Sequence, residues 1–128
     1  MRVRGRRRIA PLRIVLLVQG LYYVITGVWP LVHLASFLWV VGPKGDIFLL
    51  RTTSLLITVI GAALLMAARE RLPSLSVVVL GIAAAAVLAL VEVWHISSLR
   101  PVYLLDTAAE VLIALALIVT WVLGSQER

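Results

Sequence analysis

The sequence predicts an all-α fold, an integral membrane four-helix bundle with sequential antiparallel helices and both termini in the cytoplasm. Of the 128 residues, 62% are hydrophobic and 14% are charged, whereas about a quarter of the residues of a soluble domain are charged. Four apolar segments are each near or above the ~20 residues that a helix needs to cross a ~30 Å hydrocarbon core. Lys and Arg residues are also distributed unevenly between the ends of these segments, which indicates a defined orientation.

The four segments belong to a single transmembrane domain, residues 1–128, which begins with a basic cytoplasmic tail, 1–11. The segments are rich in Leu, Val, Ile and Ala and lack two-residue alternation. Because only helices and closed barrels satisfy the backbone in lipid, this pattern favours helices. We expect them at about 12–33, 48–68, 74–98 and 101–123.

The links between the segments indicate how the helices are arranged. RERLP, residues 69–73, ends the second helix, and Arg100-Pro101 separates the third from the fourth, since proline is tolerated in the first turn of a helix. Links this short make consecutive helices antiparallel neighbours. The outer link, 34–47, is longer and has a turn-forming centre, GPKGD at 42–46, so it either lies along the outer surface or folds over the mouth of the bundle.

The basic residues indicate the orientation. With the N-terminus inside, three basic residues are outer, and nine are cytoplasmic: Arg2, Arg4, Arg6, Arg7, Arg8, Arg13, Arg69, Arg71 and Arg128. The outer three are Lys44, Arg51 and Arg100. The positive-inside rule therefore predicts an N-in/C-in protein, and we expect it in a bacterial cytoplasmic membrane. Five arginines in the first eight residues are also found in nucleic-acid-binding arms, but in so apolar a chain we interpret them as a membrane anchor, with the lipid bilayer and no nucleic acid as partner.

Polar residues recur on one face of each predicted helix, most densely in VEVWHISSLRPVYLLDTAAEV, residues 91–111. Glu92 and His95 are three residues apart and share a face of the third helix. Tyr103, Asp106 and Glu110 follow the spacing i, i+3, i+7 on the fourth helix. The stripes of the first and second helices comprise Gln19, Tyr22, Thr26, Trp29 and His33, and Arg51, Ser54 and Thr58.

These stripes predict one polar pocket that opens outward, because charged groups within a membrane face the bundle interior or a water-filled cavity. The helical rise of ~1.5 Å per residue places Asp106 about 8 Å and Glu110 about 14 Å below the outer end, so Glu110 lies at the floor. Arg51 is the best candidate counter-ion and Arg100 the next. The expected ligand-binding residues are Tyr22, Thr26, Trp29, His33, Arg51, Glu92, His95, Tyr103, Asp106 and Glu110. In the inner half, the small residues Gly81, Ala85 and Ala89 predict close helix packing.

Metal and haem are two alternatives, neither of which is favoured. Glu92 and His95 have the Glu-x-x-His spacing of carboxylate-bridged di-iron bundles, which use two such motifs, whereas this chain has one. The metal candidates are His33, Glu92, His95 and Glu110. His33 and His95, the only two histidines, are expected at the same membrane level, as bis-histidine haem ligation requires.

Three further hypotheses use the same residues. Glu92, His95, Asp106 and Glu110 are candidate catalytic groups for acid–base chemistry on a lipid-like substrate. Alternatively, the carboxylates and aromatic rings bind a hydrophobic or amphiphilic ligand, including a cationic one. The structural alternative is a buried network in which Arg51 and Arg100 pair with the carboxylates and fix the helix packing.

Two resemblances accompany these hypotheses. The four helices, the long outer link and the acidic, histidine and tryptophan residues resemble EXPERA-type membrane proteins, which include sterol isomerases and ligand-binding relatives; this resemblance implies ligand or acid–base roles for Glu92, His95 and Glu110. The small size and basic N-terminus are similar to DoxX-like proteins, and GLYYVITGVWPLVH and VGPKGD resemble an uncharacterised family of bacterial membrane proteins. We expect a protein that binds a small hydrophobic or amphiphilic ligand; a membrane enzyme, an accessory subunit and a homo-oligomer stay open.

Overall fold

The computed structural model describes the backbone of residues 2–125 and the side chains of residues 10–124, and this part of the chain contains helices and no strand. Its elements are α1 (Arg2–Val32), α2 (Leu34–Val41), α3 (Ile47–Ala68), α4 (Leu75–Trp94), the 3-10 turn η1 (Ile96–Ser98) and α5 (Val102–Ser125). Within α1, α3, α4 and α5 lie the stretches Ala10–Val32, Ile47–Ala68, Leu75–Trp94 and Val102–Gly124, each long and apolar enough to span a membrane. The predicted all-α class and the four apolar spans are therefore confirmed.

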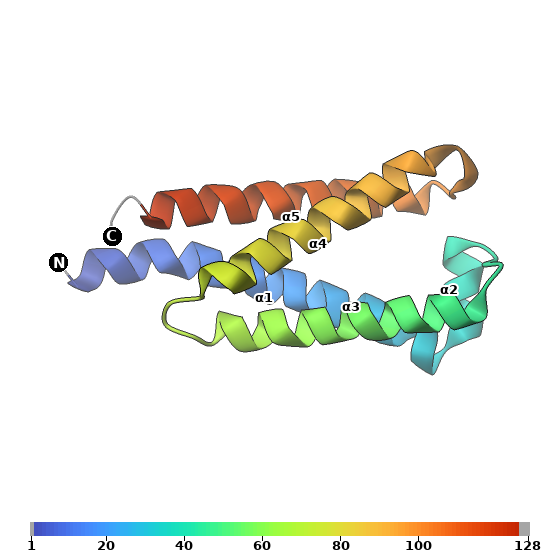
Figure 1. Cartoon of the computed structure of the whole chain (residues 1–128), viewed down its shortest axis with the longest axis horizontal. Helices are drawn as coiled ribbons and strands as arrows, with labels where there is room; N and C mark the ends of the chain where they lie inside the picture. The colour runs from blue at the N-terminus through green and yellow to red at the C-terminus, as the bar shows by residue number, and fades with distance from the viewer. Residues whose placement is uncertain (1, 126–128) are drawn as a thin grey trace.

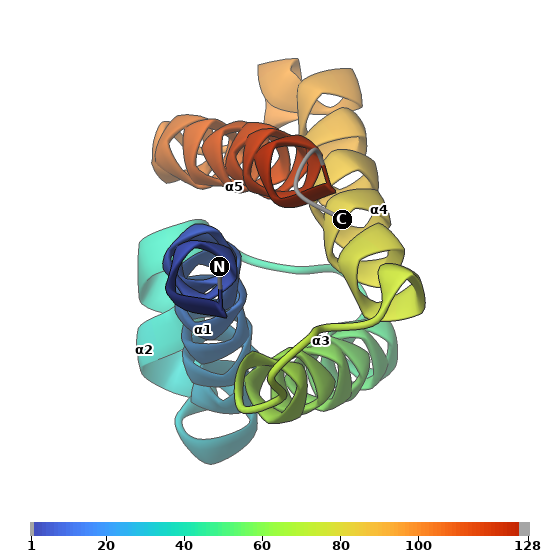
Figure 2. The same cartoon turned by 90° about the vertical axis from the view of Figure 1, so that its left-hand side faces the viewer.

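The long helices lie lengthwise beside one another (Figure 1). The ribbon leaves the end marked N along α1, returns along α3, runs out again along α4 and returns along α5 to the end marked C. Seen from that end, α4 and α5 form one side of the molecule and α1 and α3 the other (Figure 2). The helices are thus arranged as two pairs.

The pairing is unequal because α3 packs mainly on α1 and α4 mainly on α5, while α3 and α4 make few contacts with each other. Glycines allow α1 and α3 to approach closely. A Cβ atom on Gly27 would lie 2.8 Å from the carbonyl oxygen of Ser54, and one on Gly61 would lie 2.9 Å from that of Gly20. Small residues at a helix crossing permit this proximity in membrane proteins.

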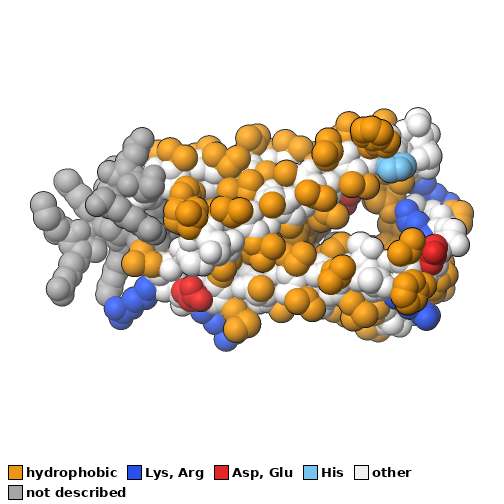
Figure 3. Space-filling view, viewed as in Figure 1, with side chains coloured by type: hydrophobic (Ala, Val, Ile, Leu, Met, Phe, Trp, Pro, Cys, Tyr) orange, Lys and Arg blue, Asp and Glu red, His pale blue; other side chains and the backbone are white. Residues whose placement is uncertain are grey.

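The tightly packed core lies toward the end of the bundle that holds both chain ends. Leu16 of α1, Leu64 of α3 and Leu117 of α5 are completely buried there, together with the predicted small-residue face of α4. Large apolar side chains elsewhere point outward, and hydrophobic residues cover most of the face in Figure 3, with charged side chains mainly near its two ends. This distribution suits a protein whose surroundings are lipid.

Several helix boundaries differ from those expected. α1 begins at Arg2, so the expected tail 1–11 continues the helix, and α1 ends at Val32 because His33 caps the separate helix α2. The outer link 34–47 is thus partly helical. The third helix ends at Trp94, before η1. Met1 and Arg128, and the side chains of the arginines before residue 10, lie outside the described residues.

Candidate functional site: a cavity lined by three carboxylates

A cavity of about 540 Å³ lies between the C-terminal halves of α1 and α4 and the N-terminal halves of α3 and α5. Its size falls in the range of ~300–1,000 Å³ that is typical of small-molecule sites. All five α-helices contribute to its wall, which consists mainly of apolar and aromatic side chains. The lining residues are Tyr22, Tyr23, Thr26, Trp29, Phe37, Val40, Val41, Lys44, Leu50, Thr53, Ser54, Ile57, Leu88, Val91, Glu92, His95, Leu99, Val102, Tyr103, Leu105, Asp106, Ala109 and Glu110.

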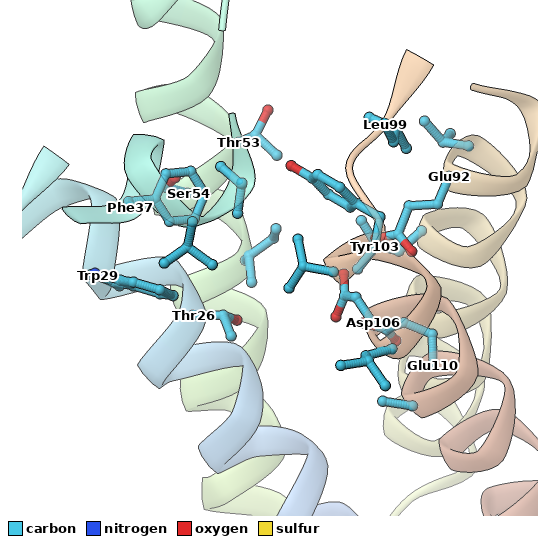
Figure 4. A pocket seen from close by; sticks show the side chains of 18 of the residues that line it. Thr26, Trp29, Phe37, Thr53, Ser54, Glu92, Leu99, Tyr103, Asp106 and Glu110 are labelled. Carbon is cyan, nitrogen blue, oxygen red and sulfur yellow. The ribbon is translucent and has the colours of Figure 1, made fainter. Parts of the chain in front are cut away.

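The stripe predicted on the fourth helix lines this cavity. Tyr103, Asp106 and Glu110 project from successive turns of α5, and Glu92 of α4 and His95, directly after α4, border the same space. Figure 4 shows Glu92, Tyr103, Asp106 and Glu110 on one side of the cavity, facing Thr26, Trp29 and Phe37 on the other. These residues of the two predicted stripes therefore lie along one wall of the cavity.

Three carboxylates, Glu92, Asp106 and Glu110, border the cavity, and we call them the cavity carboxylates. Each accepts a hydrogen bond from a hydroxyl group. Tyr23 Oη donates to Glu110 Oε2 at 2.7 Å, Thr107 Oγ1 donates to Glu92 Oε2 at 2.5 Å, and Tyr22 donates to Asp106. Glu110 is 1% exposed and Glu92 is 8% exposed. These partners are neutral, so they satisfy the oxygens without compensating any negative charge.

The arginines expected as counter-ions do not fill that role. Arg51 is exposed and does not line the cavity, because the face of α3 turned toward the cavity is that of Leu50, Ser54 and Ile57. Arg100 is also exposed and donates through Nη1 to the carbonyl oxygen of Trp39 at 2.7 Å. The expected network of arginine–carboxylate pairs is therefore absent from the described residues.

The two histidines differ in position. His33 is exposed, lies outside the cavity lining and caps α2 by accepting a hydrogen bond from Ser36 N at 3.2 Å. His95 lines the cavity at its exposed edge, and its Nδ1 lies 2.9 Å from the carbonyl oxygen of Val91, to which it donates. The two imidazoles thus do not face each other across the cavity, as bis-histidine haem ligation would require.

The metal hypothesis receives no geometric support either. Among the described residues, no three His, Asp or Glu side chains come together in a group that could hold a metal ion. Of the candidates His33, Glu92, His95 and Glu110, His33 lies outside the cavity lining, and the carboxylate of Glu110 accepts a hydrogen bond from Tyr23. The donor set therefore does not fit the bridged di-metal centre that the Glu-x-x-His spacing suggested.

The outer link forms part of the cavity wall. Phe37, Val40 and Val41 of α2 contribute to the lining. Trp29 of α1 fixes α2 in place by donating from Nε1 to Ser36 Oγ at 2.8 Å and by packing edge-on against Phe37, with ring centroids 5.4 Å apart.

After α2, the link is held against the turn between α4 and α5. Gly42 adopts a φ of +95°, which favours glycine, and a Cβ atom there would lie 3.0 Å from Arg100 Nε. Two residues later, the ammonium of Lys44 lies 4.6 Å from the centroid of the Tyr103 ring. Among the residues that line the cavity, Lys44 is the one lysine or arginine.

Three residues important to this site were missed as site residues by sequence reasoning. Tyr23 was passed over in favour of its neighbour Tyr22. Its position four residues after Gln19 places Tyr23 and Gln19 on one buried face of α1. Thr107, directly after Asp106, has no distinguishing pattern. Lys44 was assigned to a turn, and only the fold of the outer link brings it to the cavity.

Comparisons of the chain with protein-family models, with curated proteins and with solved structures found no match. What the cavity can bind therefore has to follow from the chemistry of its own residues.

Proposed function

We propose that this chain is a membrane protein that binds a small amphiphilic cation in the cavity between its helices. The topology that accompanies this proposal has consecutive helices antiparallel, both termini in the cytoplasm of a bacterial cell and the cavity toward the outer side. The excess of Lys and Arg at the end that holds the chain ends supports this orientation.

The observation that carries the proposal is the excess of acidic over basic side chains in an apolar cavity. Three carboxylates and one ammonium group line a space that is otherwise mainly apolar. Charged side chains inside a membrane are costly and mark binding or transport pathways when they face a cavity. A ligand with one positive charge would compensate part of the excess negative charge, and its apolar part would contact the aromatic and aliphatic wall.

The aromatic residues support the same ligand class. Tyr22, Trp29 and Tyr103 line the cavity, and aromatic faces attract organic ammonium groups within about 6 Å of the ring centroid. A purely apolar ligand would leave the cavity carboxylates without compensation. An anion would add to their repulsion.

Catalysis is the second candidate, and one observation favours it: His95 borders the same cavity as the three carboxylates. Groups of this kind can transfer protons to and from a lipid-like substrate. This alternative predicts a bell-shaped pH dependence of turnover. The accessory-subunit hypothesis is less favoured, because its polar stripe would face outward to a partner, whereas the carboxylates border a cavity between the helices and Glu92 and Glu110 are buried.

A matched pair of probes tests the proposed function. Benzyltrimethylammonium and neopentylbenzene have nearly the same shape, but only the first is charged. With purified protein in a nonionic detergent, isothermal titration calorimetry should show tighter binding of the cation. The Glu110→Gln variant should bind the cation at least tenfold more weakly, which corresponds to about 1.4 kcal/mol.

Glu70→Gln is the matched control, because Glu70 is an exposed glutamate in the link between α3 and α4, and it should leave the affinity unchanged. Equal affinity of the wild-type protein for the two probes would contradict cation selectivity. An equal effect of the two Glu→Gln substitutions would contradict the assignment of the cavity as the site.

A further inference from the structure

Lys44 already places a cation in the cavity. Its Nζ lies 4.6 Å from the centroid of the Tyr103 ring, within the distance at which an aromatic face attracts an ammonium group. Tyr103 belongs to the same stripe of α5 as Asp106 and Glu110. The ammonium also attracts the carboxylate of Glu92 on α4. The chain's own positive charge is thus held over the Tyr103 ring, beside the wall that carries Glu92.

Lys44 lies in the turn between α2 and α3, outside both helices. Its side chain can therefore move away from the cavity by rotation about its own bonds, with no change in the neighbouring helices. The start of α3 is fixed independently, because Asp46 caps it by accepting from Leu49 N at 3.0 Å. Lysine itself carries a compact charge on a flexible four-carbon stem.

We propose that the Tyr103 ring, with Glu92 and Asp106, forms the subsite for the cationic group of the ligand, and that Lys44 occupies it as a tethered competitor until a ligand displaces it. This inference rests on the proposed function and specifies where the ligand's charge is bound. A monovalent cation can replace the ammonium group of Lys44 without changing the net charge in the subsite, whereas a neutral amphiphile cannot.

A tethered group competes because its effective concentration near its site is high, on the order of millimolar for a short flexible connection. Removal of the competitor should therefore strengthen binding of a cation. Lys44→Met keeps most of the length of the side chain and removes its charge. We expect it to bind benzyltrimethylammonium about tenfold more tightly than the wild-type protein, with less than a twofold change for neopentylbenzene.

Two control variants separate competition from a general effect of charge. Arg51→Met removes a positive charge from an exposed residue outside the cavity lining, and it should change the affinity for the cation less than twofold. Lys44→Arg retains a positive charge and should stay within about threefold of the wild-type affinity. Circular dichroism and gel filtration of each variant establish that it is folded.

A second measurement uses the wild-type protein, in which Lys44 is the only lysine. Displacement from the cavity should expose its amine, so acetylation of Lys44 by a water-soluble N-hydroxysuccinimide ester, followed by mass spectrometry, should become several-fold faster when benzyltrimethylammonium is bound. Neopentylbenzene should leave the rate unchanged.

The possible failures can be distinguished. If wild-type protein binds the cation through Glu110 but Lys44→Met binds it no more tightly, or acetylation is not accelerated, the displacement of Lys44 is wrong and the proposed function stands. If neither the wild-type protein nor Lys44→Met prefers the cation to its neutral analogue, the proposed function fails and this inference fails with it.

Discussion

Replacement of Tyr23 by phenylalanine tests whether hydroxyl groups hold the cavity carboxylates in place. Tyr23 and Glu110 are each 1% exposed, and the phenol donates to Glu110 Oε2 at 2.7 Å. Interhelical polar pairs in membranes contribute about 0.6 kcal/mol on average, whereas a buried group that loses its partner costs about 1–3 kcal/mol. Because neither end of this pair reaches the surface, the second case applies. We expect Tyr23→Phe to lower the free energy of unfolding by about 2 kcal/mol.

The assay is reversible unfolding in mixed nonionic detergent and dodecyl sulfate micelles, followed by far-ultraviolet circular dichroism. Tyr103→Phe is the matched control, since the Tyr103 hydroxyl makes no hydrogen bond within the described residues, and it should change the stability by less than about 0.5 kcal/mol. The double variant Tyr23→Phe/Glu110→Met removes both polar partners and should recover much of the loss.

Either of two results would refute this reasoning about Tyr23. Tyr23→Phe could prove as stable as Tyr103→Phe, which would mean that the buried hydrogen bond contributes nothing. Alternatively, the double variant could lose the sum of the two single losses, which would mean that Tyr23 and Glu110 are not coupled.

Two more predictions concern helix packing and pH. Gly27→Ala should destabilise the protein by about 1–3 kcal/mol despite the helix preference of alanine, because its Cβ would lie 2.8 Å from the carbonyl oxygen of Ser54 and 2.4 Å from Thr58 Oγ1. The same unfolding assay should show no such loss for the control variant Gly45→Ala. Equal stabilities of the two variants would contradict close packing of α1 on α3. Affinity for benzyltrimethylammonium should fall as the pH is lowered from about 8 to 4, because protonation removes negative charge from the cavity carboxylates. Calorimetry at each pH measures this dependence, and an affinity that rose on acidification would exclude a binding site based on carboxylate charge.

The helices and the polar wall on α4 and α5 could be predicted from the sequence because both depend on local periodicity. The spacing of Tyr103, Asp106 and Glu110 identifies one helix face whatever the neighbours are. Their partners depend on tertiary packing. Tyr23 reaches Glu110 only because α1 lies against α5. Its spacing from Gln19 places it on the same face of α1 but does not indicate its partner.

His33 and Arg51 lie outside the predicted site for physical reasons that hydropathy does not reveal. His33 was counted as the end of a transmembrane stripe, but its side chain caps α2 and stays exposed. Arg51 shares a stripe with Ser54 and Thr58, yet the packing of Gly27 against the last two determines how α3 is rotated. That rotation turns Leu50 to the cavity and leaves Arg51 exposed at the start of the helix.

The cavity follows from this unequal packing of the helices. Gly20, Gly27 and Gly61 allow α3 to approach α1 closely, and α3 then makes few contacts with α4. Near the chain ends, leucine side chains such as Leu64 and Leu117 fill the space between the two helix pairs. Toward the opposite end, the positions that face inward carry Tyr22, Glu92 and Asp106 instead. The glycines that hold α1 and α3 together thus also determine how much room is left for a ligand, so Gly27→Ala should disturb binding as well as stability.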